Sequence, residues 1–414
     1  MKYAIIIPDG CADWAVESLG GRTPLQAART PNLDSLAKTG IIGRSQNVPA
    51  GMPPGSDVAT LGLLGYNPSQ YYTGRAPLEA AAQGIELQTN DWAIRCNLVT
   101  IENNVMKSFT AGHISSGEAK TLIDALNDAL FNKVAPASPI GLQFYAGVSY
   151  RNLVIARDRV PLSENTKTYP PHDYTDQKID SVLPSGDGNL FLRDLMDASR
   201  RIFAKHSVNL QRIESGKLPA TQIWLWGIGQ KPQLPLFADR FSSTPIRGAM
   251  ITAVDLLRGI ASLIGWDIIN VPGITGYVDT DFAAKGNYAA EALKDHDLVC
   301  VHVEATDEAG HEGSVEKKVK AMEDIDALVI PPVLEALKSY GDWRLFVSPD
   351  HPTPVAIKTH TSDYVPWLLA GNDLTTLTST STASASGYDE ETARNSRFRY
   401  DNGWEMLGQL FIRK

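Results

Sequence analysis

The segment LFVSPDHPTPVAIKTHTSD, residues 345–363, places an apolar run directly before Asp350 and His351, and His360 follows soon after. A strand that ends in a carboxylate and an imidazole is an unusual way to build a core, but it is a common way to build a metal site. The segment therefore predicts metal ligands at the end of a buried strand, and the rest of the chain must supply further ligands.

Strands and helices alternate regularly in the part of the chain that leads to this segment. Such alternation predicts a mostly parallel sheet with helices on both faces, which is an α/β fold. The amino terminus adds a buried strand, a helix and a short strand of the same kind. The predicted strands are 2–10, 41–48, 222–229, 266–273, 297–305 and 343–351, and the predicted helices lie within 23–40, 247–265, 287–295 and 314–340.

The middle of the chain lacks this strict alternation. It predicts paired strands in 91–109 and 140–157 and helices in 115–131 and 191–212, which together indicate an α+β unit. We therefore expect an α/β domain of residues 1–72 and 236–414, interrupted by an inserted α+β domain of residues 73–235. The Ser/Thr-rich residues 375–396 are expected to form a surface loop.

The composition is that of a soluble globular protein, with 43% hydrophobic and 21% charged residues in a chain of 414. The net charge of −9 disfavours nucleic acid or an anionic membrane as the main partner, but a local metal cluster still allows a small anionic substrate. Cys11, Cys96 and Cys300 have no metal-site or redox-motif spacing, and no apolar run reaches the ~20 residues of a membrane helix. We expect reduced thiols and a cytoplasmic protein; the sequence does not predict the oligomeric state.

Three more candidate ligands follow predicted strands. Asp9 ends the first strand, and Asp307 and His311 are four residues apart, so one helical turn would aim both at one point. Taken singly, Asp9 is also compatible with a turn, the Asp307 segment with a solvated acidic turn, and His360 with a structural role. Taken together with Asp350 and His351, they meet at one edge of a parallel sheet and suffice for two ions such as Mn²⁺ or Zn²⁺.

Ser56 in MPPGSDVATLG is the candidate nucleophile. Gly55 allows close approach of the backbone, and a helix that begins at Ser56 would point free N–H groups at a phosphate. A metal could lower the pKa of its hydroxyl enough for attack. The alternative is that Ser56 only caps the helix.

The motifs IIPDG, PPGSDVATLGLLGYNP, EATDEAGHEG and PDHPTPVAIKTHTSDYVPW resemble those of the archaeal-type cofactor-independent (2,3-bisphosphoglycerate-independent) phosphoglycerate mutases of the alkaline phosphatase superfamily. The resemblance covers nearly the whole chain. It implies an alkaline-phosphatase-like catalytic domain. One metal would take Asp307, His311 and His360.

The resemblance implies a second metal held by Asp9, Ser56, Asp350 and His351. Ser56 would take the phosphoryl group from 3-phosphoglycerate and return it to the 2-hydroxyl, with the glycerate held by the inserted domain in a closed cleft. Mn²⁺ is the expected metal, with Mg²⁺, Zn²⁺ or Co²⁺ as alternatives. 2,3-Bisphosphoglycerate would not be required, and the role would be in glycolysis and gluconeogenesis.

Basic residues are needed for a doubly anionic substrate, and an arginine can bind a carboxylate or phosphate through two parallel hydrogen bonds. Each candidate could equally be an ordinary surface or packing cation. The candidates are Arg95, His113, Arg151, Arg247 and Lys285.

Two features depart from the archaeal pattern. Trp226 stands where those mutases tend to carry an arginine, and the carboxyl-terminal region lacks their Arg/Gly-rich stretch. The carboxyl-terminal region is similar to that of a bacterial subgroup of the family with a proposed homoserine kinase role in threonine biosynthesis. A phosphotransferase with another acceptor, such as homoserine, is therefore the main alternative. A plain phosphatase and a metal-binding protein without phosphoryl chemistry are weaker alternatives. A Walker-type loop for ATP is absent from the sequence.

Overall fold

Strand β1 (Lys2–Pro8), formed by the apolar sequence KYAIIIP, pairs in parallel with β10 (Leu298–Val303) on one side and β11 (Trp343–Val347) on the other. In the computed structural model these strands form the centre of an eight-stranded sheet with the order β13-β2-β12-β11-β1-β10-β8-β9. Strand β12 (Val365–Gly371) is antiparallel to β11 and to β2 (Ile41–Ser45), and the other recorded pairs are parallel. The predicted α/β fold with a mostly parallel sheet is confirmed.

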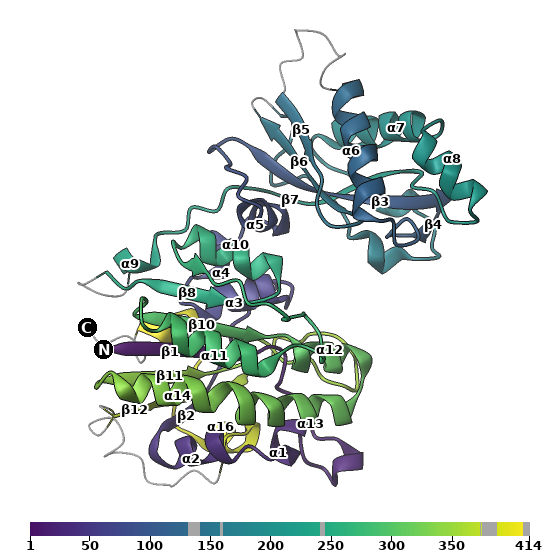
Figure 1. Cartoon of the computed structure of the whole chain (residues 1–414). Coiled ribbons are helices and arrows are strands. Elements are labelled where there is room, and N and C mark those ends of the chain that lie inside the picture. The colour runs from purple at the N-terminus through teal and green to yellow at the C-terminus, as the bar shows by residue number, and fades with distance from the viewer. Residues whose placement is uncertain (131–140, 158–159, 241–244, 373, 375–386, 409–414) are drawn as a thin grey trace. The chain divides into compact units, whose positions relative to one another are not determined.

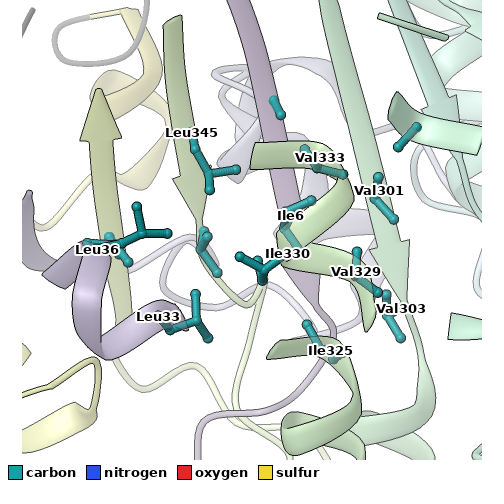
Figure 2. Close-up of a cluster of buried hydrophobic side chains, with 14 of the residues drawn as sticks. Ile6, Leu33, Leu36, Val301, Val303, Ile325, Val329, Ile330, Val333 and Leu345 are labelled. Carbon is teal, nitrogen blue, oxygen red and sulfur yellow. The ribbon is translucent and has the colours of Figure 1, made fainter. Parts of the chain in front are cut away.

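Side chains of β1 are buried on both faces of this sheet. Ile6 packs in a core with residues of α14 (Ile330–Ser339), as Figure 2 shows for Ile330 and Val333. Ile5 points to the opposite face, because successive side chains of a strand alternate, and it too is 0% exposed. A strand buried on both faces reads as a continuous apolar run, which is why the sequence signal was clear.

The chain divides into two compact units. Unit 1 comprises Met1–Tyr72 and Gln233–Lys414 and contains the eight-stranded sheet, and unit 2 comprises Thr73–Pro232. Figure 1 traces both units in colours that follow the chain. The structure describes residues 1–130, 141–157, 160–240, 245–372, 374 and 387–408.

Unit 2 is built around the long strand β3 (Trp92–Glu102), which pairs antiparallel with β4, β6 and β7. One face of this sheet packs against α6 (Ser116–Leu130) and α7 (Asn189–Phe203), and the other packs against α5 (Arg75–Ala82). Antiparallel strands with helices outside any strict alternation agree with the α+β character that the sequence predicted.

The remaining elements complete the two units. In unit 2 they are β4 (Val105–Ser108), β5 (Gly141–Tyr145), β6 (Arg151–Arg157), η2 (Pro171–Tyr174), η3 (Asp180–Val182), α8 (Ser207–Glu214) and β7 (Gln222–Gln230). In unit 1 they are η1 (Glu17–Leu19), α1 (Pro24–Ala27), α2 (Pro31–Thr39), α3 (Ser56–Leu63), α4 (Pro68–Tyr71), α9 (Phe237–Arg240), β8 (Gly248–Ile251), α10 (Asp255–Leu263), β9 (Asp267–Ile268), α11 (Phe282–Ala292), α12 (Ala305–Glu312), α13 (Val315–Asp324), the π-helix η4 (Ile325–Val329), α16 (Glu390–Asn395), β13 (Arg399–Tyr400) and α17 (Gly403–Met406).

Two predicted helices are wrong in extent. The first, 247–265, is strand β8 followed by α10, because the fully buried Gly248–Ile251 pairs with β10 before the helix begins. The second, 191–212, is divided into α7 and α8, because α7 ends at Phe203 and His206 is the N-cap of α8, where its side chain accepts a hydrogen bond from the backbone of Val208.

Other differences are smaller. The predicted strand 266–273 is only two residues long, and β12 was not predicted. The helix predicted over 314–340 is continuous but contains a π-helical turn before two prolines, whose missing N–H groups disturb the regular ladder. Of the predicted surface loop, residues 375–386 lie outside the described residues, and Glu390–Asn395 forms α16. Within the described ranges, every helix is too short or too polar to cross a membrane.

Candidate active site

Three neighbouring parallel strands deliver the candidate ligands to one edge of the sheet. Asp9 follows β1, α12 with Asp307 follows β10, and Asp350 and His351 follow β11. Since β1 lies between the other two strands, their carboxyl ends are adjacent, which is where open α/β sheets bind ligands.

The first group of ligands, which we call the Asp307 set, consists of Asp307, His311 and His360. One donor atom from each residue lies within 4.8 Å of the others. Asp307 Oδ2 is 3.2 Å from His311 Nε2, Asp307 Oδ1 is 3.4 Å from His360 Nε2, and the two imidazole nitrogens are 2.9 Å apart. The helical spacing of Asp307 and His311 produces this convergence, because both side chains leave the same face of α12.

The second group, the Asp9 set, consists of Asp9, Ser56, Asp350 and His351. His351 Nε2 lies 3.5 Å from both Asp9 Oδ1 and Asp350 Oδ2, and it is 3.1 Å from Ser56 Oγ. Both carboxylates and the imidazole are at most 2% exposed. The structure therefore brings together all seven ligand candidates in these two sets, including the serine.

Asp9 shows that the site fits cations. Its Oδ1 is buried without a hydrogen-bond partner among the described residues. Burial, together with the negative charges of Asp350 and Asp307, raises the pKa of Asp9 well above its usual value despite the nearby His302. Buried carboxylates that include an oxygen without a hydrogen-bond partner, set among imidazoles, form a donor set suited to Mn²⁺ or Zn²⁺.

Hydrogen bonds with His311 and His360 have the largest lowering effect on the pKa of Asp307. Burial would raise the pKa of Asp307, but hydrogen bonds with His311 and His360 outweigh it and hold the pKa well below its usual value. The same bond to Asp307 raises the pKa of His311 to about 9. Asp307 is thus an anion, and His311 carries a proton that a metal ion would have to displace.

Ser56 is the first residue of α3 rather than its cap. The N-cap position is Gly55, and no side chain caps the helix. The simple capping role considered from the sequence therefore does not account for Ser56. Its hydroxyl is half-buried and faces the imidazole of His351, at a helix start whose free N–H groups favour an anion.

Sequence reasoning missed a buried network behind Asp9. His302 Nε2 lies 3.0 Å from Asp9 Oδ2, and its Nδ1 is 3.3 Å from Glu304, which in turn pairs with Lys285 at 3.0 Å. Burial would lower the pKa of His302, but Glu304 and Asp9 raise it to about 10. The available signal was the spacing of His302 and Glu304, two apart on a predicted strand and so on one face.

Two of the five predicted basic residues, Arg247 and Lys285, belong to unit 1. Arg247 precedes β8 at the amino edge of the sheet, opposite to the ligand sets, where its backbone N–H bonds to Asp297. Lys285 is 0% exposed and donates to Glu304 and to the carbonyl of His302. Its contacts are those of a structural cation behind Asp9.

The remaining three predicted basic residues belong to unit 2. The guanidinium of Arg95 stacks 3.9 Å from the ring centre of Trp226 and pairs with Glu79 through two bonds of 3.0 and 3.1 Å. Arg151 is exposed and lies over the ring of Tyr150. His113 is exposed in the loop after β4 and has a positive φ of 52°.

Positive charge is concentrated around Arg95. Burial lowers its pKa, the pairing with Glu79 opposes this, and the neighbouring Arg75 and Arg151 lower it further. The ring of His172 is 5.5 Å from Trp226. Burial lowers the pKa of His172, and the charges of Arg95 and Arg75 lower it further. We call these four residues, Arg75, Arg95, Arg151 and His172, the Arg95 cluster; the positive charges of its three arginines favour a bound anion.

Comparisons with known proteins decide the family. The chain is 47% identical over 411 residues to the 2,3-bisphosphoglycerate-independent phosphoglycerate mutase of Methanosarcina mazei, with 99% of each chain covered. Residues 37–209 match the family model described as 2,3-bisphosphoglycerate-independent phosphoglycerate mutase. The chain belongs to this family of mutases.

Solved structures agree with this membership. The cofactor-independent phosphoglycerate mutase from Thermoplasma acidophilum has a TM-score of 0.66 and is 25% identical, with 99% of this chain and 100% of that chain covered. A protein from Pyrococcus horikoshii has a TM-score of 0.78 and is 27% identical, covering 98% and 95%. The similarity to the mutase family therefore extends over both units.

Trp226 is one of the two features at which the sequence is expected to depart from the archaeal mutase pattern. The indole N–H donates to Asn97 Oδ1 at 3.0 Å, and its ring supports Arg95. This part of unit 2 therefore still has a cation beside the tryptophan, because the guanidinium of Arg95 stacks on the Trp226 ring.

Proposed function

We propose that this member of the mutase family interconverts 3-phosphoglycerate and 2-phosphoglycerate by transferring the phosphoryl group to and from Ser56. The observation that carries the proposal is the placement of Ser56 Oγ, 3.1 Å from His351 Nε2, beside buried carboxylates of which Asp9 Oδ1 has no hydrogen-bond partner among the described residues. A nucleophile beside a cation site is the arrangement that phosphoryl transfer through an enzyme-bound intermediate needs.

The proposal includes two divalent metal ions, with Mn²⁺ as the expected metal. The Asp307 set would hold one ion and the Asp9 set the other, supported by the donor atoms gathered at 2.9–3.5 Å. When bound, the ions would neutralise phosphoryl oxygens and lower the pKa of the Ser56 hydroxyl. Oxygen and imidazole donors suit Mn²⁺ as well as Zn²⁺, so a metal panel decides the preference.

Ser56 would act in two steps whose atoms balance. In the first, Ser56 Oγ loses its proton and bonds to phosphorus, while the bond from phosphorus to the 3-oxygen breaks and that oxygen takes up a proton. In the second, the 2-oxygen loses its proton and bonds to phosphorus, while the bond from phosphorus to Ser56 Oγ breaks and Oγ takes up a proton. Free N–H groups at the start of α3 would bind the phosphoryl oxygens in both steps.

Unit 2 would hold the glycerate end of the substrate through the Arg95 cluster. Arg95 is fixed by Glu79 and Trp226, and a guanidinium with a fixed plane binds a carboxylate through two parallel bonds. A cytoplasmic location is part of the proposal and is supported by the three cysteines, which are buried and unpaired.

The first experiment is phosphorus NMR of the Mn²⁺-loaded protein with 3-phosphoglycerate, without ATP or 2,3-bisphosphoglycerate. We expect 2-phosphoglycerate to appear, and EDTA to abolish the conversion. A fully metal-loaded protein that leaves 3-phosphoglycerate unchanged would contradict the proposal. Homoserine with a panel of phosphoryl donors would then test the main alternative predicted from the sequence.

A further inference from the structure

Thr353 lies between the two ligand sets and contacts both. It is 0% exposed, and its backbone N–H donates to the carbonyls of Gly10 and Ala12 at 3.2 and 3.3 Å. A Cβ atom built on Gly10 would lie 2.4 Å from Thr353 Oγ1, and one built on Gly310 would lie 2.4 Å from Thr353 O. Both glycines thus allow the close approach that holds the threonine in one position.

The hydroxyl of Thr353 makes two hydrogen bonds with different partners. It donates to Asp307 Oδ1, a member of the Asp307 set, and its oxygen is 3.3 Å from His351 Nδ1, a member of the Asp9 set. A hydroxyl has a single proton and can accept through its lone pairs. Because an ionised carboxylate can only accept, the proton of Thr353 is used by Asp307.

This count fixes the proton on His351. Toward the imidazole, Thr353 can only accept, so His351 Nδ1 must carry the hydrogen. His351 Nε2 is then left with its lone pair, and this is the nitrogen that faces Ser56 Oγ at 3.1 Å and the carboxylates of Asp9 and Asp350 at 3.5 Å. Only a nitrogen without a hydrogen can bind a metal or accept the serine proton.

We propose that Thr353 is a positioning residue that fixes the tautomer of His351 and links His351 to Asp307 through its hydroxyl, so that metal binding at the two ligand sets is coupled. The inference rests on the proposed function for the metal sites, but its tautomer can be measured in the metal-free protein. Loss of the hydroxyl would free His351 to adopt the other tautomer and would release Asp307 from its alignment.

The test uses Thr353→Val, which keeps the shape and removes the hydroxyl, and Thr353→Ser, which keeps the hydroxyl. Thr100→Val is the matched control: Thr100 is also 0% exposed, and its hydroxyl donates to the carbonyl of Pro219 in unit 2. The readouts are nitrogen NMR of ¹⁵N-histidine-labelled protein, to assign the tautomer of His351, and Mn²⁺ binding by electron paramagnetic resonance.

In wild-type protein we expect His351 to carry its hydrogen on Nδ1. In Thr353→Val we expect a mixture of tautomers and roughly 10–100-fold weaker Mn²⁺ binding at both sites, as for other residues that orient metal ligands. Thr353→Ser and Thr100→Val should keep the wild-type tautomer and affinity. A Thr353→Val protein that retains two sites of wild-type affinity would overturn the inference.

The wild-type spectrum tests the inference even if Thr353→Val does not fold, since a hydrogen on His351 Nε2 would overturn it directly. Weakened binding at only one site would overturn the coupling of the two sets. A wild-type protein that binds no Mn²⁺ would instead overturn the proposed function and the coupling with it. If the wild-type protein binds Mn²⁺ and Thr353→Val shows the same tautomer and affinity, the inference about Thr353 is overturned and the proposed function stands.

Discussion

Ser56 and its neighbours show how much depends on the placement of one hydroxyl. The residue is the first of the eight in α3, and Ser207 holds the same position in the eight-residue α8 of unit 2. The two serines thus share a local backbone position. Only Ser56 has an imidazole within hydrogen-bond distance of its hydroxyl in the described contacts.

Ser56→Ala should reduce turnover of 3-phosphoglycerate by on the order of 10⁴-fold or more, because no other group would accept the phosphoryl group. Mn²⁺ should still bind, since the carboxylates and imidazoles remain. Coupled enzyme assays and metal titration measure the two effects. Ser207→Ala is the control and should retain full activity; substantial turnover by Ser56→Ala would show that another residue is the nucleophile.

Lys285 tests the buried network behind Asp9. Its ammonium group pairs with Glu304 at 3.0 Å, with 0% and 4% of the two side chains exposed. Lys285→Met should destabilise unit 1 by about 3–5 kcal/mol, because it leaves Glu304 buried without its cation. Urea denaturation of the metal-free protein measures this change.

The control for Lys285 is Lys294→Met. Lys294 pairs with Glu291 at a similar distance of 2.7 Å, but both side chains are largely exposed, so water screens the pair. No measurable change in stability is expected for this variant. Equal effects of the two substitutions would argue against a structural role for the buried pair and would return Lys285 to the candidates for substrate binding.

At the scale of elements, the sequence spacing of Asp307 and His311 on α12 produces a candidate metal site. Asp307 and His311 lie one turn apart, and their hydrogen bond raises the pKa of His311 to about 9. In the metal-free protein His311 is therefore protonated at neutral pH, and a metal ion must displace that proton. Since lower pH favours the protonated ring, metal affinity should rise with pH.

Between pH 7 and 8.5 we expect the Mn²⁺ affinity of the Asp307 set to rise by about tenfold per pH unit, as for the release of one proton. Calorimetry in buffers of different ionisation enthalpy measures the proton directly. His206→Gln in unit 2 should keep this slope, and His311→Gln should lose it. An affinity independent of pH in the wild type would contradict the proton count.

Elements with one strong signal were predictable from the sequence. β1, β10 and β11 are continuous apolar runs followed by candidate ligands, and adjacency in a parallel sheet brings those side chains together. β8 was not predictable, because a short buried strand before a helix reads like the start of that helix. β12 was missed because its antiparallel direction breaks the alternation on which the prediction depended.

The contacts that buried polar residues make with distant parts of the chain could not be predicted from the sequence either. His302 and Thr353 act through partners that lie far away in the chain: Asp9 for the first, and Asp307 for the second. A single sequence without its fold gives no distance between such residues. Arg247 shows the converse, because its residue type suited an anion while its strand placed it at the opposite edge.

At the scale of the whole molecule, the proposed metal ligands all belong to unit 1, which is assembled from both ends of the chain. Asp9 and Ser56 come from residues 1–72, and the other five come from residues 233–414. Unit 2 contributes the Arg95 cluster and none of the proposed ligands. Metal binding should therefore stabilise one unit and leave the other unchanged, because a ligand stabilises only the structure that binds it.

Hydrogen exchange measured by mass spectrometry separates the two units. With free Mn²⁺ at 100 times its dissociation constant, opening of the ligand-bearing segments should become less favourable by about 2.7 kcal/mol, which is a roughly 100-fold slower exchange. The slowing should appear in peptides after β1, β10 and β11 and in α12, while β3 in unit 2 should exchange at the metal-free rate. Equal slowing in both units would show that metal acts on the whole chain rather than on a site in unit 1. No slowing in either unit would remove the metal sites from the proposed function.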